Sequence, residues 1–356
     1  CGVAAQKSHP GVLTCSMSAG VGPCHGAVRP IVGETALPWG ATLPVMAVAP
    51  TTVDPVLRTV LDAVPFQLTT DGGPEPARRR FADLPRKSVH PEVSTADRSV
   101  EGPAGPVPVR IYRPAAPADV LPVVVFIHGG GWSVGDLDTY DGAARMHAAG
   151  GDALVVSVGY RLAPEHPYPA AVDDTWAVTR WVLRHAAELG GDPGRVAVAG
   201  DSAGGNLAAV MAQLARDAGT PLRYQLLWYP STTFDTSLES FAENAGAPVL
   251  DAAACRGFTR WYLSGADVDM SAPPATLVPA RGDLTGLPAA YIAVAGHDPL
   301  RDDGIRYAEL LAGAGVAVEL HNAESLVHGY LGYAGVVPAA TAATDRGLAC
   351  LRAALT

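Results

Sequence analysis

The pentapeptide Gly-Asp-Ser-Ala-Gly at residues 200–204 has the residue types and spacing of a nucleophile elbow, G-x-S-x-G. It joins residues 195–202, an apolar run typical of a buried strand, to residues 203–219, a run typical of a helix. In such an elbow the serine occupies a sharp turn that lifts its hydroxyl above a sheet edge, beside the positive end of a helix. We therefore predict that Ser202 is the nucleophile of an acyl-transfer enzyme. The alternative is an ordinary strand-to-helix turn.

The sequence HGGGW at residues 128–132 is a second candidate for chemistry, because it stands at the end of the continuous apolar run of residues 121–130. Acyl transfer generates an oxyanion, and backbone N–H groups that point at this oxygen lower the barrier. Glycines let the backbone direct its N–H groups into a cavity without side chains that would block a substrate. We predict that this segment contributes an oxyanion hole. A flexible turn is the alternative.

A serine nucleophile of this kind needs an acid and a base later in the chain, in the order serine, acid, histidine. Asp298 ends the apolar run of residues 289–298, and His328 lies in a glycine-rich and aromatic loop after the last predicted strand. The histidine accepts the serine proton, and the carboxylate holds the imidazole in the required tautomer. We predict Asp298 and His328 for these roles. Their rivals are three other aspartates and two other histidines: Asp283, Asp302, Asp303, His297 and His321.

The cysteines give no indication of a metal site. The chain contains five of them, Cys1, Cys15, Cys24, Cys255 and Cys350, and no C-x-x-C pair. Structural zinc sites usually use such pairs, so we predict neither a metal nor a cofactor. An odd number of cysteines in a chain of this size also implies no disulfide framework.

An alternation of strand-like and helix-like segments positions these residues. Repeated strand–helix units form a parallel sheet that helices cover on both faces, so the predicted fold class is α/β. The predicted strands are residues 106–114, 121–130, 153–161, 195–202, 223–230, 289–298 and 316–324. The predicted helices in this part of the chain are residues 170–189, 203–219, about 255–263, about 303–314 and 338–354.

Changes in this pattern divide the chain into three regions. Residues 1–52 are rich in glycine, proline, alanine and serine without sustained periodicity, and we predict a flexible or adventitious extension. Residues 53–100 carry apolar residues at helical spacing and are predicted to form an N-terminal helical cap. Residues 101–356 are predicted to form the catalytic domain, with a cap insertion at about 231–270 where the alternation is interrupted.

Four blocks of sequence together resemble the hormone-sensitive-lipase-like family (family IV) of bacterial carboxylesterases, in the α/β-hydrolase superfamily. They are HGGGW at 128–132, YRLAPEHPYPAAVDD at 160–174, GDSAGG at 200–205 and DPLRDDG at 298–304. The resemblance covers roughly residues 53–356. It implies an α/β-hydrolase fold with an eight-stranded, mostly parallel sheet, helices on both faces, a helical cap and hydrolysis of short acyl esters without a cofactor.

The resemblance also implies roles for individual residues. Carried over by position, the N–H groups of Gly130, Gly131 and Ala203 would form the oxyanion hole. Glu165 and Asp173 would stabilise loops behind the site, with a solvated or capping role as the alternative. Residues 271–288 depart from the family's pattern, so the resemblance says nothing of the wall that they build.

The formal net charge is −10 at pH 7. An acidic surface disfavours nucleic acid or an anionic membrane as the main partner, and simple solubility is the other explanation of the charge. The sequence has no run of 18 apolar residues, so we predict no transmembrane helix. We predict a cytoplasmic protein with a small-molecule ester as its partner. Secretion or lipid attachment through the N-terminal region stays open, and so does a homodimer.

These observations together predict a serine carboxylesterase that hydrolyses short-chain acyl esters through an acyl-enzyme intermediate. One alternative is an amide or N-acetyl hydrolase with the same triad, because both reactions pass through an acyl-enzyme. The other is a ligand-binding protein that kept the fold and lost the reaction, and such a protein should lack a triad member. A series of p-nitrophenyl esters beside matched amides distinguishes these functions.

Overall fold

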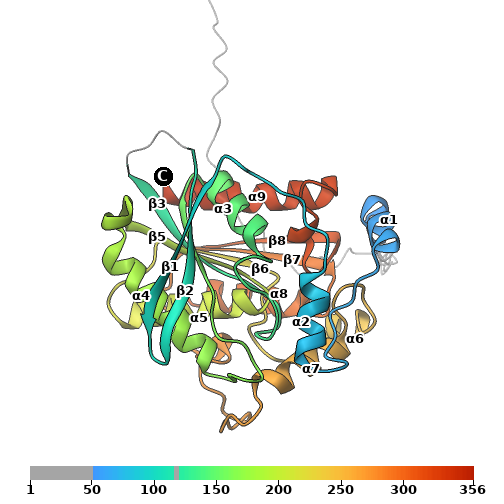
Figure 1. The fold of residues 1–356 in the computed structure, drawn as a ribbon. Helices are drawn as coiled ribbons and strands as arrows, with labels where there is room; N and C mark the ends of the chain where they lie inside the picture. The colour runs from blue at the N-terminus through green and yellow to red at the C-terminus, as the bar shows by residue number, and fades with distance from the viewer. Residues whose placement is uncertain (1–50, 116–119) are drawn as a thin grey trace, which may run out of the picture. The chain divides into compact units, whose positions relative to one another are not determined.

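An eight-stranded sheet runs through the structure, a computed structural model that describes residues 51–115 and 120–356 (Figure 1). The strands are β1 (Ser94–Gly102), β2 (Gly105–Arg113), β3 (Leu121–Ile127), β4 (Leu154–Val158), β5 (Gly191–Asp201), β6 (Tyr224–Trp228), β7 (Ala290–His297) and β8 (Val318–Val327). Their order in the sheet is β1-β2-β4-β3-β5-β6-β7-β8. The pairs β1/β2 and β2/β4 are antiparallel, and the other neighbouring pairs are parallel. Except for its last two residues, the predicted extension at 1–52 lies outside the described residues.

Helices cover both faces of this sheet (Figure 1). One face carries α4 (Ala170–His185), α5 (Ala203–Asp217) and α8 (Arg301–Gly313), and the other carries α3 (Asp141–Gly151) and α9 (Pro338–Leu355). The described residues also form three short 3-10 helices: η1 (Ala187–Leu189), η2 (Pro279–Arg281) and η3 (Tyr330–Tyr333).

Strand β3 shows why the sheet needs both helical layers. Val123 and Val125 pack in the same cluster as Leu207 of α5, whereas Val124 and Phe126 pack in the cluster of α3 and α9. All four side chains are fully buried, and burial of each contributes about 1.5–3 kcal/mol relative to exposure. A strand that is apolar on both faces is typical of a parallel sheet between two layers of helices.

The carboxyl ends of the parallel strands meet at one edge of the sheet. HGGGW follows β3, Ser202 follows β5, Asp298 follows β7 and His328 follows β8. Ligands of open α/β sheets bind outside this edge. The architecture confirms the predicted α/β-hydrolase fold with an eight-stranded, mostly parallel sheet.

Four further helices come from two segments far apart in the chain: α1 (Pro55–Ala63), α2 (Pro74–Ala82), α6 (Glu239–Glu243) and α7 (Ala252–Tyr262). The two segments meet where the Leu68 N–H donates to the Val249 carbonyl at 2.8 Å. Residues of α2 and α7 also share a hydrophobic cluster that is separate from the two sheet clusters: Ala77, Val134, Leu250, Ala254 and Phe258. This packing joins the predicted cap segment to the predicted insertion.

Aspartates fix where two of these helices begin. The carboxylate of Asp54 accepts the Leu57 N–H of α1 at 3.0 Å, and that of Asp251 accepts the Ala254 N–H of α7 at 2.7 Å. Such N-caps satisfy N–H groups that have no partner within the helix.

The predicted boundary between cap and catalytic domain, at residues 100 and 101, falls inside a strand. Residues 94–102 form β1 and pair along their whole length with β2. The segment 94–100 therefore belongs to the sheet and not to the helical cap. Within β1 only Val100 is buried, because β1 is an edge strand with both faces largely exposed. It consequently lacks the alternating apolar pattern that identifies a strand.

The sequence interpretation did not include α3 or α6. Three of the eleven residues of α3 are glycines, which weaken a helix pattern. One reason for glycine here is the close approach of α9: a Cβ on Gly150 would lie 2.7 Å from Leu348 Cδ1. Tertiary packing therefore outweighs local propensity in α3.

Candidate active site

The predicted elbow is a sharp turn between β5 and α5. Ser202 has φ 55° and ψ −118°, a combination that non-glycine residues rarely adopt. Its N–H donates to the Trp228 carbonyl of β6 at 2.8 Å, which helps to hold the turn. A Cβ on Gly204 would collide with the Ile127 carbonyl, and one on Gly200 with the Gly204 carbonyl. Glycine is therefore required on both sides of the serine.

The structure brings Ser202, His328 and Asp298 into one hydrogen-bonded chain. Ser202 Oγ lies 2.9 Å from His328 Nε2, and His328 Nδ1 lies 2.7 Å from Asp298 Oδ2. In the tautomer that satisfies both bonds, Nδ1–H donates to the carboxylate and the serine hydroxyl donates to Nε2. Asp298 and His328 are 0% and 3% exposed. The other carboxylate oxygen, Oδ1, accepts the Leu300 N–H at 2.8 Å, so the acid is held on both sides.

The rival acids bind other groups. Asp302 pairs with Arg301, Asp303 accepts the N–H groups of Thr232 and Thr233, and Asp283 accepts the Thr285 N–H. None of these carboxylates contacts a histidine within the described residues.

The rival bases, His297 and His321, also lie apart from the serine. Within the described part of the chain, neither donates to nor accepts from Ser202. Partial burial lowers the pKa of each imidazole.

The glycine run after β3 adopts a backbone that favours glycine. Gly130 and Gly131 have φ 99° and 58°, and the Gly130 carbonyl accepts the N–H groups of Ser133 and Val134 at 3.0 and 2.9 Å. In residues 51–115 and 120–356, the N–H groups of Gly130, Gly131 and Ala203 donate to no protein acceptor. These three N–H groups therefore have no acceptor within the described part of the protein.

A cavity of about 340 Å³ opens beside the nucleophile. Gly131, Ser202 and Ala203 line it, whereas Gly130 does not. Most of the remaining wall is apolar: Leu68, Trp132, Phe234, Phe241, Leu250, Phe258, Met270, Pro299 and Leu300. Both predicted cap segments contribute to this wall, and its apolar part suits a hydrocarbon chain.

Asp201 supports the site from behind, and sequence analysis assigned it no role. Its side chain is buried, and its carboxylate accepts the Gly129 N–H at 2.9 Å and the Tyr140 hydroxyl at 3.2 Å. Burial raises the pKa of the Asp201 carboxyl to about 6, although the bond from Gly129 opposes this shift. Asp201 thus fixes the glycine run relative to the elbow. It occupies the variable position of G-x-S-x-G, and an acid directly before the serine is the signal that could have found it.

Arg78 of α2 fastens the cap segment to the loops beside the site. Its guanidinium donates to Glu165 Oε1 at 3.0 Å, to the Ala163 carbonyl at 2.9 Å and to the Ser133 carbonyl at 2.9 Å. Glu165 therefore contributes to holding α2. For Asp173, partial burial raises the carboxyl pKa, and the residue makes no side-chain hydrogen bond within the described ranges.

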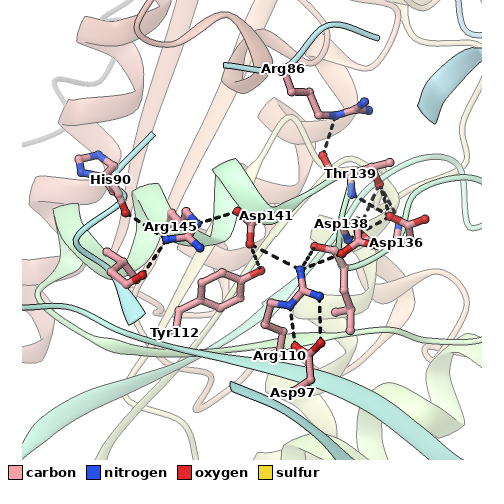
Figure 2. Close-up of polar contacts among 12 residues, drawn as sticks. Arg86, His90, Asp97, Arg110, Tyr112, Asp136, Asp138, Thr139, Asp141 and Arg145 are labelled. Carbon is pink, nitrogen blue, oxygen red and sulfur yellow. Dashed lines mark hydrogen bonds and ion pairs between the residues drawn. The ribbon is translucent and has the colours of Figure 1, made fainter. Parts of the chain in front are cut away.

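A second polar network lies where the chain passes from the cap to the sheet (Figure 2). Arg110 of β2 pairs with Asp97 of β1 at 2.6 Å and with Asp138 at 2.9 Å, and it lies 3.6 Å from Asp141. Arg145 of α3 pairs with Asp141 and donates to the carbonyls of residues 90 and 93. We call this group, shown in Figure 2 with Arg86, Tyr112 and Thr139, the connector network. It ties the segment after α2 to the sheet edge and to the start of α3.

No group of three or more His, Cys, Asp or Glu residues in the described ranges could hold a metal ion. Among the helices that the structure describes, none is long and apolar enough to cross a membrane.

Comparison with known proteins places the chain among esterases. A family model described as alpha/beta hydrolase fold matches residues 124–332. Esterase LipI of Mycobacterium tuberculosis is 61% identical over 307 residues, which are 85% of this chain and 95% of that protein. Carboxylesterase NlhH of the same species is 58% identical over 308 residues, 85% of this chain and 96% of that protein. The crystal structure of DphMB1 superposes with a TM-score of 0.83 at 68% identity, and covers 85% of this chain and 99% of that chain.

Proposed function

The chain belongs to the hormone-sensitive-lipase-like carboxylesterases of the α/β-hydrolase superfamily, and from this premise we propose that it hydrolyses short-chain acyl esters with Ser202, Asp298 and His328 as its catalytic triad. The enzyme is a carboxylic ester hydrolase. The observation that carries the triad is the pair of hydrogen bonds, 2.9 and 2.7 Å long, that joins the three side chains.

The first half of the reaction transfers the acyl group to the enzyme. Ser202 Oγ attacks the ester carbonyl as His328 Nε2 takes the hydroxyl proton, and the buried Asp298 stabilises the imidazolium that forms. When the tetrahedral intermediate collapses, the bond to the alcohol oxygen breaks and His328 gives the proton to the departing alcohol. The second half repeats these steps with water as the nucleophile, which releases the acid and restores Ser202.

Each half of the reaction passes through a tetrahedral intermediate with an oxyanion. We propose that this oxyanion accepts hydrogen bonds from the N–H groups of Gly130, Gly131 and Ala203. Ala203 stands at the N-terminus of α5, where the helix dipole also favours negative charge. Donors that are already oriented need no rearrangement as charge develops, and each is worth about 3–4 kcal/mol of transition-state stabilisation in a comparable hydrolase.

The preference for short acyl chains is proposed from the cavity. Its volume of about 340 Å³ is at the lower end of ligand sites, and residues of both cap segments line it. We propose that the cap consists of about residues 53–93 together with the insertion at 231–270. A series from p-nitrophenyl acetate to the palmitate should therefore show kcat/KM falling once the chain outgrows the cavity. Matched anilides in the same series test the alternative of amide hydrolysis.

The nucleophile is tested with Ser202→Ala, which should fold normally and lose about 10⁴–10⁶ of kcat. Ser264→Ala is the matched control, because Ser264 is exposed and lies outside the cavity. A serine-directed organophosphate should add once to the native chain, and peptide mapping should find it on Ser202. Ester hydrolysis by Ser202→Ala above a few per cent of the native rate, with host esterases excluded, would show that the assignment is wrong.

A further inference from the structure

Two arginines stand on the wall of the cavity that contains Ser202. Arg256 and Arg260 belong to α7, four residues apart, so they lie on the same side of the helix one turn from each other. Both are exposed. Cys255, Phe258 and Thr259 of the same helix also line the cavity, so α7 forms a large part of the wall.

The two guanidinium groups have no hydrogen-bond acceptor among the described residues. Within the part of the chain that the structure describes, neither Arg256 nor Arg260 makes an ion pair or donates a side-chain hydrogen bond. The contact of Arg256 is with the ring of Phe241, 5.5 Å from its centroid. A guanidinium carries five N–H donors and no acceptor, so about ten donors are open to a ligand at this wall.

The carboxylates on the same wall are partly occupied by groups of the protein. Asp235 accepts the N–H and the hydroxyl of Ser237 at 2.9 and 2.6 Å. Asp303 is 3% exposed and accepts the Thr232 N–H, the Thr232 hydroxyl and the Thr233 N–H. Among the charged groups of the wall, the two guanidiniums therefore lack acceptors within the described residues, and one oxygen of the exposed Asp235 lacks a donor there.

The arginines belong to the helix that packs against the glycine run after β3. A Cβ on Gly131 would lie 2.5 Å from Phe258 Cγ, so α7 rests directly against the oxyanion segment. Arg256 and Arg260 are two residues before and after Phe258, which places their Cα atoms about 3 Å along the helix axis on either side of it. Ser202 and both arginines line the same cavity, so a ligand that extends from Ser202 along this cavity can reach one or both guanidiniums.

Guanidinium groups bind carboxylates through two parallel hydrogen bonds, more strongly than neutral donors do. The lining between Ser202 and the arginines is apolar, and it suits methylene groups. A molecule that satisfies both features has an ester at one end, a short hydrocarbon chain and an anion at the other end.

We propose that the cavity accepts esters that carry a second, free carboxylate, such as the monoesters of aliphatic dicarboxylic acids, and that Arg256 and Arg260 bind this carboxylate. The inference rests on the proposed function, because Ser202 cleaves the ester at the other end. It names the substrate class of the same site and leaves the triad chemistry unchanged.

The experiment compares matched neutral and anionic substrates. The monomethyl and dimethyl esters of succinic, adipic and suberic acid share an acyl chain and differ in one charge. A second arm uses acetate esters of ω-hydroxy acids, which carry the carboxylate on the alcohol side. The variants are Arg256→Gln, Arg260→Gln and the double variant. Arg223→Gln is the control, because Arg223 is exposed and lies outside the cavity wall.

The double variant should lower kcat/KM for the preferred anionic ester by about 3–10-fold, mainly through KM, as expected for two partly exposed ion pairs. The dimethyl esters and Arg223→Gln should be unaffected. The arm that responds shows whether the carboxylate lies on the acyl or the alcohol side.

Equal kcat/KM ratios of anionic to neutral ester in the native enzyme and the double variant, in both arms, would overturn the proposal. That result leaves the proposed function intact, whereas failure of the native enzyme to cleave the dimethyl esters would count against the function itself.

Discussion

The loops around Ser202 and the connector network contain the same kinds of polar groups, but they differ in burial. Asp298 and His328 are almost completely buried, whereas the side chains of Asp97 and Asp138 in the connector network are 63% and 83% exposed. An exposed ion pair contributes about 0–1 kcal/mol. A buried polar group that loses its partner costs about 1–3 kcal/mol. The same chemistry therefore has different consequences in the two places.

The two regions differ also in redundancy. Arg110 lies near three carboxylates, so the loss of one leaves two (Figure 2). His328 Nδ1 faces Asp298 and no other carboxylate among the described residues. A substitution in the connector network is thus compensated locally, and a substitution in the buried loops is not. Substitutions in both regions test this contrast.

The largest effect is expected from Asp298→Asn. An amide in place of the carboxylate favours the wrong tautomer of His328 and no longer stabilises the imidazolium, so kcat should fall about 10⁴-fold with little change in KM. Steady-state kinetics with p-nitrophenyl acetate measures this fall in kcat. Asp283→Asn is the matched control, since Asp283 binds only a turn N–H. A fall of less than tenfold would remove Asp298 from the triad.

The second largest effect is expected from Asp201→Ala. It leaves the Gly129 N–H and the Tyr140 hydroxyl without their acceptor in a buried site, so the free energy of unfolding should drop by about 1–3 kcal/mol. Asp201→Asn keeps an acceptor for Gly129 and should lose less. Denaturant unfolding at neutral pH compares the two. Equal stability of Asp201→Ala and the native protein would contradict a supporting role.

Asp201→Asn also changes the pH dependence of stability. Burial raises the folded-state pKa of Asp201 from 3.8 to about 6. The folded protein therefore holds this proton more tightly than the unfolded chain does. The resulting contribution to the free energy of unfolding is fully present below the pKa of the unfolded chain, and it is lost as the pH rises through about 6. Between about pH 4 and pH 7 the native protein should therefore lose stability relative to Asp201→Asn, and parallel stability curves would contradict this.

Arg78→Ala and Arg79→Ala compare neighbouring arginines of one helix. Arg78 is partly buried and holds two loop carbonyls as well as Glu165, so its loss should cost about 1–2 kcal/mol of stability and raise KM. Arg79 makes an exposed pair with Glu75, and its loss should change stability by less than about 0.5 kcal/mol. Equal effects of the two changes would mean that Arg78 does not fasten the cap.

The smallest effect is expected from Asp138→Ala in the connector network. Arg110 keeps Asp97 and Asp141, so stability and kcat/KM should remain within about 0.5 kcal/mol of the native values. Thermal unfolding and ester kinetics measure both. A loss of more than 1 kcal/mol in the free energy of unfolding would show that the connector network acts as a unit. The network would then not be redundant in the way described above.

The sequence predicted those parts of the fold whose signal is local. The strands that are apolar on both faces, such as β3 and β5, and the long helices α4, α5 and α9 were identified from their patterns. The edge strand β1 was missed because only Val100 is buried in it. Helix α3 was missed because the glycines that admit α9 weaken its pattern.

The candidate site divides in the same way. Ser202, His328 and Asp298 were predicted because chain order and strand ends imply where they meet, and in the structure they are hydrogen-bonded. Glu165 lies in one of the four blocks that carried the resemblance, but its partner Arg78 is 87 positions away and belongs to none of them. The cavity wall likewise combines Leu68 with residues of α7. Contacts of this kind depend on tertiary structure and leave no local pattern.

The contact between Phe258 and Gly131 has a consequence for how this enzyme can evolve. One ring forms part of the cavity wall and also packs against the oxyanion segment. Mutations at Phe258 that admit a bulkier substrate would therefore disturb the turnover machinery as well, and selection for new activities should find few solutions there. Leu68 and Met270 also line the cavity, but their side chains are not in the contact with Gly131 that Phe258 makes. Mutant libraries should accumulate changes in substrate range at those two positions first.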